Sequence, residues 1–264
     1  MKAEELFKEL NPITKSLTSF VCLTGSHNYH LEDENSDYDF KLFVYPTFKD
    51  LYNGDKKNSR DTKICDQDLK TTDIRFFKST LEKSNINFLE VLYSEDIFIP
   101  TKENEELDKA NKQMIAVLQK NREMFAAMNI HYLIKAVKGS VCSRMKQFKN
   151  GNYKAASQAF KETLMLGRYL TNLYRGEEDP FLNAIKFKKE DAMRSIYFDI
   201  RNKVISDDKI MKSLALVEQD MDSIIQKGNF DSREKDLMAC NLLEMTLEKA
   251  VAIRIQMELN GRCK

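Results

Sequence analysis

The alternation of hydrophobic and polar residues differs between the first hundred residues and the rest of the chain. Four runs in the first part are rich in β-branched and aromatic residues and end at polar residues, which predicts strands at residues 17–25, 39–45, 62–71 and 91–100. After the third run, Thr72 or Asp73 is the expected N-cap of a helix that reaches about residue 83. This mixture indicates an α/β domain.

From about residue 103 onward, apolar residues recur with the period of helices and strand patterns end. Glycine, proline and asparagine residues break the pattern, so we expect helices at residues 103–148, 152–175, 188–205, 207–227 and 231–259. The sequence therefore predicts an α+β fold in which a mixed sheet with helices, residues 1–102, is followed by an all-helical domain, residues 103–264.

Composition narrows the class of protein. The net charge of +1 argues against a general nucleic-acid coat protein, and no apolar run approaches the roughly 20 residues of a membrane span. The five cysteines show no C-x-x-C spacing, which favours reduced thiols and a cytoplasmic location: Cys22, Cys65, Cys142, Cys240 and Cys263. Cys22 and Cys65 fall in strand-like runs, so we expect both to be small buried residues.

Residues 24–41, T-G-S-H-N-Y-H-L-E-D-E-N-S-D-Y-D-F-K, combine the residue types of a phosphate-handling site. A strand ends at Gly25 and Ser26, a short helical turn follows, and a second strand opens with Asp37. Side chains alternate along a strand, so Asp37 and Asp39 project from one side with Cα atoms about 6–7 Å apart. Two such carboxylates can share a pair of Mg²⁺ ions, about 3.5–4 Å from each other.

Gly25 and Ser26 complete this pattern. Glycine allows the backbone to come close to a phosphate, because it has no Cβ. The hydroxyl and amide of Ser26 can then donate to a triphosphate. We therefore expect Gly25 and Ser26 to bind nucleotide, and Asp37 and Asp39 to bind Mg²⁺.

Gly-Ser, ten residues and then Asp-x-Asp is similar to the signature of the DNA polymerase β-like nucleotidyltransferase superfamily. The resemblance implies transfer of a nucleoside monophosphate from an NTP, expected to be ATP, to an acceptor hydroxyl, with release of pyrophosphate. It also implies a third carboxylate on a neighbouring strand, as a metal ligand and as the base for that hydroxyl. Asp68, in C-D-Q-D-L-K, is the preferred residue, and Asp66, on the same strand face, is the alternative.

Two longer segments resemble the YcgL-type predicted nucleotidyltransferases of bacteria and phages. Residues 73–94 look like the helix and the N-P-N-x-L-E-L-L segment of that group, with Ile86 in place of proline. Residues 153–170 match its helical part, with Gln158 and Lys161 where the group has His and Arg. The resemblance covers roughly residues 20–200.

The helical part carries a basic region. Nine Lys or Arg residues and one acid, Glu162, lie between His131 and Arg175. Eight of them form two helical stripes, Lys135, Lys138, Lys146 and Lys149 in one and Lys154, Lys161, Arg168 and Arg175 in the other, and Arg144 lies on the opposite side of the first helix. A break at Asn150 and Gly151 would fold the helices into an antiparallel pair with a basic groove. Lys146, Lys154 and Lys161 are the expected nucleotide-binding residues, and a solvated basic face is the alternative.

These patterns favour an enzyme that transfers a nucleotidyl group to RNA, protein or a small molecule. The alternative is a non-catalytic or antitoxin-like nucleotide-binding module. The absence of a G-x-x-x-x-G-K-[ST] segment argues against a P-loop kinase. His27 and His30 lack further soft ligands, so polar contacts or surface positions are expected for them in place of zinc binding.

Overall fold

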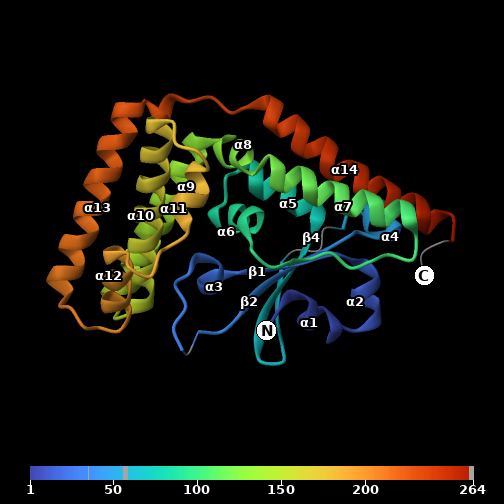
Figure 1. The fold of residues 1–264 in the computed structure, drawn as a ribbon, viewed down its shortest axis with the longest axis horizontal. Coiled ribbons are helices and arrows are strands. Elements are labelled where there is room, and N and C mark those ends of the chain that lie inside the picture. The colour runs from blue at the N-terminus through green and yellow to red at the C-terminus, as the bar shows by residue number, and fades with distance from the viewer. Residues whose placement is uncertain (35, 56–58, 262–264) are drawn as a thin grey trace. The chain divides into compact units, whose positions relative to one another are not determined.

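The computed structural model describes residues 1–34, 36–55 and 59–261 and has an α+β fold (Figure 1). The chain divides into two compact units. The first comprises Met1–Lys83, Asn87–Met128 and Asp236–Lys264, and the second comprises Ser84–Ile86 and Asn129–Lys235. Among the described residues, no helix combines the length and the apolar composition of a membrane span.

In the first unit, one mixed sheet has the strand order β3-β4-β2-β1-β5. Its strands are β1 (Thr18–Thr24), β2 (Asp39–Val44), β3 (Arg60–Ile64), β4 (Gln67–Asp73) and β5 (Ile97–Phe98). Strands β2 and β4 run parallel, whereas every other neighbouring pair is antiparallel. The parallel pair places the start of β4 beside the start of β2, so residues that open these two strands become neighbours.

The strands predicted at residues 17–25 and 39–45 are confirmed as β1 and β2. The single strand predicted at residues 62–71 is wrong, because the chain turns at Cys65 and Asp66 and forms the hairpin β3–β4. Both turn residues have positive φ, 49° and 62°. Asp66 therefore does not share a strand face with Asp68, and Cys65 is exposed, contrary to the burial expected for it.

The strand predicted at residues 91–100 is also wrong for most of its length. The segment forms the 3₁₀ helix η1 (Glu90–Tyr93) and the two-residue strand β5. Between them the Ser94 hydroxyl donates to the carbonyl oxygens of Leu23 and Asp96, at 2.7 and 3.2 Å. These bonds hold a bend, so only Ile97 and Phe98 pair with β1.

The sheet is covered on both faces. On one face, helix α1 (Ala3–Lys8) contributes to a core with alternate residues of the strands: Ala3, Leu6, Leu10, Val21, Phe40, Leu42, Val44 and Leu69. On the other face, Phe20 and Phe43 contact Phe77 of helix α5 (Ile74–Glu82), with ring centroids 6.2 and 4.6 Å away. The N-cap of α5 is Asp73, whose side chain accepts a hydrogen bond from the Arg75 amide.

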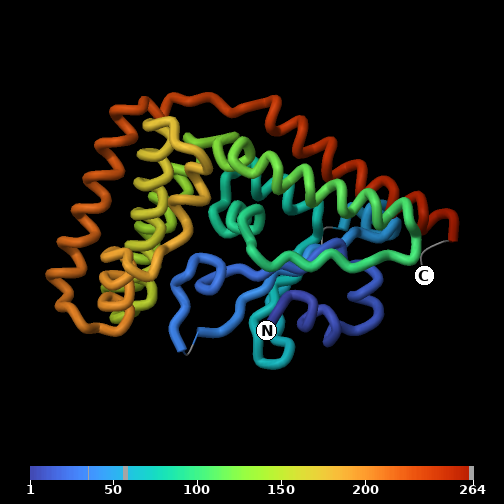
Figure 2. The backbone as a smooth tube through the Cα atoms, viewed as in Figure 1, coloured from blue at the N-terminus to red at the C-terminus, as the bar shows by residue number. Residues whose placement is uncertain are grey.

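The remaining helices of this unit are α2 (Pro12–Leu17), α3 (Gly25–Tyr29), α4 (Phe48–Tyr52), α7 (Glu105–Lys120), α8 (Arg122–Ala127) and α14 (Leu237–Leu259). Figure 2 shows α14, at the end of the chain, running beside α7. The compact units thus differ from the predicted domains of residues 1–102 and 103–264. The buried amide of Asn111 explains why α7 stays on the sheet: it accepts from Ser19 and Tyr45 hydroxyls at 2.7 and 3.0 Å.

The second unit is helical in its described residues. It contains α9 (Ile130–Lys149), α10 (Tyr153–Arg175), α11 (Pro180–Ile185), α12 (Ala192–Arg201), α13 (Asp207–Gly228) and the 3₁₀ helix η2 (Phe230–Ser232). Short helix α6 (Ile86–Leu89) lies where the chain leaves this unit for the first one. Helix α10 contacts α9, α11, α12 and α13, which explains why many of its side chains are buried. The helix predicted at residues 103–148 is three helices, α7, α8 and α9.

Candidate functional site in the first unit

Gly25 and Asp39 are in direct contact at the end of the sheet. A Cβ added to Gly25 would lie 2.1 Å from Oδ2 of Asp39 and 2.8 Å from its Cγ. Gly25 also has φ +71°, a conformation that favours glycine. Glycine is therefore required at this position for two structural reasons, the close Asp39 carboxylate and the positive φ. The approach of a phosphate, which the sequence suggested, would be a third reason.

Asp39 and Asp68 are neighbours across the parallel pair of strands. Their Cα atoms are partners in the register of β2 and β4, and partners in adjacent strands lie about 5 Å apart with side chains on one face. The same row continues to Thr24 of β1 and Lys63 of β3. Nζ of Lys63 lies 3.5 Å from Oδ1 of Asp68, and both side chains are more than half exposed. The row thus contains a partly buried carboxylate, Asp39, and an exposed one, Asp68, beside the Lys63 cation.

Asp37 and Ser26 lie next to this row in the chain. Asp37 is exposed and precedes β2, which begins two residues later at Asp39. Ser26 is half-buried in α3, directly after Gly25. The structure therefore brings together Gly25, Asp39 and Asp68, and it leaves Asp37 on the segment that leads into the site. Asp66 lies in the β3–β4 turn, one residue before β4 begins, so Asp68 is the better candidate for the third carboxylate.

The two histidines of this segment have structural contacts. The ring of His27 stacks on Tyr38, with centroids 3.9 Å apart and planes at 4°. Its Nε2 lies 3.2 Å from the carbonyl oxygen of Ser36. His30, with φ +59°, has Nε2 at 3.1 Å from a carboxylate oxygen of Glu95. The stack joins α3 to the start of β2 and so helps to hold the Gly-Ser turn (residues 25–26) near Asp39.

A buried ion pair lies under the site, and the sequence alone did not reveal it. Nζ of Lys41 donates to Oε1 of Glu90 at 2.6 Å, with the two side chains 8% and 4% exposed. The second oxygen of Glu90, Oε2, accepts from the backbone amide of Gly25 at 3.1 Å. Its backbone carbonyl accepts from the Asn28 side chain at 3.2 Å. Lys41 follows Asp39 by two residues and therefore lies on the same strand face. A charged residue at this position in a buried strand was the sequence signal that could have indicated the ion pair.

Burial beside this pair affects Cys22, whose Cα is the partner of Lys41 in the β1–β2 register. Burial raises the pKa of the Cys22 thiol to about 12, although the nearby Lys41 charge lowers it. At pH 8 we expect Cys22 to react with iodoacetamide at least about 100-fold more slowly than exposed Cys65 and Cys142, because the thiolate is the reactive form. Mass spectrometry of labelled peptides measures this. Equal labelling of Cys22 and Cys65 in the native protein would contradict the burial, and unfolding in urea should abolish the difference.

The basic residues expected to bind nucleotide lie in the second unit. Lys146 and Lys154 are exposed, in the last turn of α9 and the first turn of α10, and these helices contact each other after the turn at Gly151. Lys161 is buried. Several basic residues of this region pair with acids within 2.7 Å: Lys138 with Asp222, Arg144 with Glu162 and Arg168 with Asp191. The second stripe is therefore not a continuous exposed row, and Lys146 and Lys154 remain the accessible candidates.

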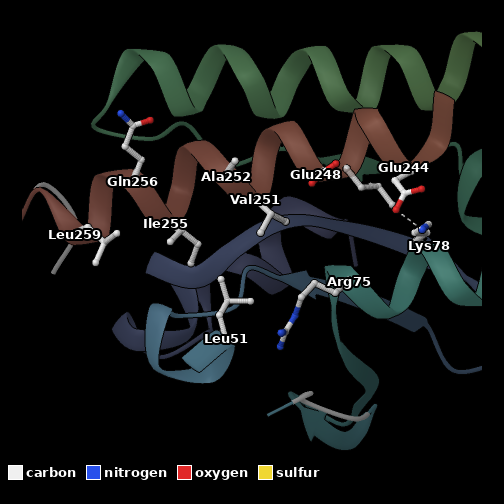
Figure 3. Close-up of a pocket in the computed structure, with 11 residues that line it drawn as sticks. Leu51, Arg75, Lys78, Glu244, Glu248, Val251, Ala252, Ile255, Gln256 and Leu259 are labelled. Carbon is white, nitrogen blue, oxygen red and sulfur yellow. Dashed lines mark hydrogen bonds and ion pairs between the residues drawn. The ribbon is translucent and has the colours of Figure 1, made fainter. Parts of the chain in front are cut away.

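A groove of about 550 Å³ in the first unit lies between α14, α5 and α4 (Figure 3). Its walls are mostly apolar and include Leu51, Leu247 and Ile255. The charged groups at its edge already have partners, since Lys78 donates to Glu244 at 2.6 Å and Arg75 binds Asp73. None of the described residues that line this groove is a predicted site residue. The groove is therefore separate from the candidate nucleotide site.

The donor chemistry at Asp39 and Asp68 suits Mg²⁺, which prefers oxygen ligands and takes several of them from water and substrate phosphates. In the described part of the chain, no group of three or more His, Cys, Asp or Glu side chains is arranged as a metal site. Asp39 and Asp68 are partners in the register of β2 and β4, and Asp37, Asp39 and Asp68 stay predicted metal ligands. No family model matches this chain, and no curated protein matches it.

Proposed function

We propose that the chain is a Mg²⁺-dependent nucleotidyltransferase, which moves a nucleoside monophosphate from an NTP to an acceptor hydroxyl. The observation that carries this proposal is the contact of Gly25 with Asp39, together with the pairing of Asp39 with Asp68 in adjacent parallel strands. A phosphate-binding turn and two carboxylates on one face are the parts that such a transfer requires.

In this proposal each residue has a defined task. Asp37, Asp39 and Asp68 would hold two Mg²⁺ ions, which neutralise charge on the triphosphate when bound. The Ser26 hydroxyl and amide would donate to phosphate oxygens, whereas the Gly25 amide already donates to Glu90. Asp68 would accept the proton of the acceptor hydroxyl while the oxygen of that hydroxyl bonds to the α-phosphorus. The bond between the α-phosphorus and the bridging oxygen breaks, and pyrophosphate leaves.

The position of Lys63 agrees with this division of tasks. Its ammonium group lies 3.5 Å from Asp68 and compensates part of the charge of the carboxylate pair. Since both side chains are more than half exposed, the contact is weak and a divalent cation can replace it. Lys146 and Lys154 stay predicted phosphate contacts in the second unit, and ATP, in the cytoplasm, stays the expected donor.

The proposal is tested by incubating the protein with each labelled NTP and Mg²⁺. Label is then sought in RNA, in the protein itself, in small molecules and in pyrophosphate. Pyrophosphate release together with a labelled acceptor supports transfer and identifies the acceptor class. Tight binding of an NTP that is recovered intact with every acceptor would instead favour the nucleotide-binding module.

The third carboxylate is tested by Asp68→Ala. We expect transfer to fall about 100-fold or more, because a general base contributes roughly 10²–10⁴-fold in the transition state. Affinity for Mg-NTP should change much less, since the proton moves only during reaction. Rates and equilibrium binding are measured separately.

Asp66→Ala is the matched control for this prediction. It removes a carboxylate two residues away, in the β3–β4 turn, and should leave transfer within about twofold of wild type, while alanine at the positive φ of this turn lowers stability by roughly 1 kcal/mol. Loss of transfer in Asp66→Ala with normal transfer in Asp68→Ala would show that the choice between them is wrong.

A further inference from the structure

Glu90 joins three parts of the first unit that are distant in the chain. It lies in η1, and its two carboxylate oxygens bind different elements: Oε1 accepts from Lys41 of β2, and Oε2 accepts from the backbone amide of Gly25 at the start of α3. Its own carbonyl accepts from Asn28, at the other end of α3. One residue therefore links the Gly-Ser turn to the strand that carries Asp39.

The environment of Glu90 favours a fixed geometry. Both members of the Lys41–Glu90 pair are almost completely buried, and Nζ of Lys41 also lies 5.9 Å from the centre of the Phe88 ring. A buried carboxylate needs a partner for its charge and hydrogen bonds for its oxygens, and removal of either is strongly unfavourable. Here Lys41 supplies the charge and Gly25 supplies a backbone donor, so the carboxylate has little freedom to move.

The link lies close to the contact between Gly25 and Asp39. The Gly25 position is closed to a Cβ by Oδ2 of Asp39, so the turn and the carboxylate are in close contact. Lys41 is two residues after Asp39 on the same strand face. Glu90 therefore connects the turn to β2 close to the contact between Gly25 and Asp39.

We propose that Glu90 is a positioning residue, which holds the Gly-Ser turn against the Asp39 end of β2 so that the turn is ready for a nucleotide. The role rests on the proposed function for its effect on nucleotide binding. The contact itself is a property of the protein without nucleotide. Glu90 acts through the turn and does not touch substrate.

The test compares variants that separate the reach of Glu90 from its charge. Glu90→Asp keeps a carboxylate for Lys41, whose long side chain can follow it, but is too short to reach Gly25 as well. Glu90→Gln keeps the length and an acceptor oxygen for Gly25 but removes the charge. Glu82→Asp is the matched control, because it shortens a carboxylate paired with Lys78 on α5 by the same methylene group.

In Glu90→Asp we expect the Gly25 amide to exchange hydrogen about tenfold faster or more in the nucleotide-free protein. We also expect KM for Mg-NTP to rise about 10–100-fold with a smaller change in kcat, which is the usual effect of losing a residue that orients a binding group. Glu90→Gln should show a smaller rise in the exchange rate at Gly25 and in KM, but a lower thermal stability than Glu90→Asp. Glu82→Asp should match wild type in exchange at Gly25. If Glu90→Gln does not fold, Lys41→Met/Glu90→Gln replaces it, since removing both charges relieves the buried imbalance.

Unchanged exchange at Gly25 in Glu90→Asp would overturn the proposal, as would an equal increase across the whole unit. A rise in exchange confined to Gly25 and its neighbours in α3, without a rise in KM, would overturn the part that concerns nucleotide. Wild-type protein that neither binds nor turns over Mg-NTP would contradict the proposed function instead, and exchange at Gly25 would still decide the role of Glu90 in the turn.

Discussion

Asp39→Asn is expected to lower Mg²⁺-dependent NTP turnover by about 1,000-fold or more, the scale of losing a group that acts directly on the transition state. Asp39 opens β2, contacts the position of Gly25 and is the register partner of Asp68. Among the described residues, no other predicted ligand both contacts Gly25 and pairs with a second predicted ligand in the sheet. Asparagine keeps the shape of the side chain but removes the charge that a metal ion requires.

The fold should survive this substitution, because asparagine keeps the size of the side chain, which is only partly buried. Thermal unfolding measured by circular dichroism checks this, and turnover is measured by pyrophosphate release. Asp220→Asn, on the exposed side of α13, is the charge-matched control and should leave turnover unchanged. Asp37→Asn should act in the same direction as Asp39→Asn. Wild-type turnover in the double variant Asp37→Asn/Asp39→Asn would remove both residues from the site.

The strands that matter for the site could be predicted from the sequence, since β1 and β2 are rich in β-branched and aromatic residues between polar ends. The hairpin β3–β4 could not. Its turn consists of Cys65 and Asp66 with positive φ, whereas the usual signal for such a turn is Asn-Gly or Asp-Gly. The consequence was that Asp66 was placed on a strand, although it lies in the turn, whereas Asp68 does lie in β4.

Contacts between distant segments account for the rest of what the sequence did not reveal. Periodicity shows that α7 has a buried face, but not what covers that face. The polar residue Asn111, fully buried, holds α7 on the sheet through Ser19 and Tyr45. Glu90 lies within residues 73–94, but its hydrogen bond to Gly25 joins residues 65 positions apart in the chain, which a local pattern cannot predict.

Gly25→Ala is expected to destabilise the protein and to reduce turnover about 100-fold or more, because the new Cβ would displace the Asp39 carboxylate, and such a shift at reacting groups has effects of that size. Alanine at φ +71° costs roughly 1–2 kcal/mol. The overlap with Asp39, 2.1 Å to Oδ2, adds about 1–3 kcal/mol of strain. Urea unfolding measures the stability, and pyrophosphate release measures the turnover.

Gly54→Ala separates the two causes, since Gly54 has nearly the same φ, +69°, and nothing lies within 4 Å of the added Cβ. It should show only the backbone cost and normal turnover. Gly25→Ala made in an Asp39→Ala background should also be less harmful than in the wild type, because the Oδ2 and Cγ contacts are gone. We expect the two substitutions to be coupled by about 1 kcal/mol or more, as contacting residues are. Additive effects on the free energy of unfolding would show that Gly25 and Asp39 do not constrain each other, and equal losses of turnover in Gly54→Ala and Gly25→Ala would show that the Gly-Ser turn has no special place in the site.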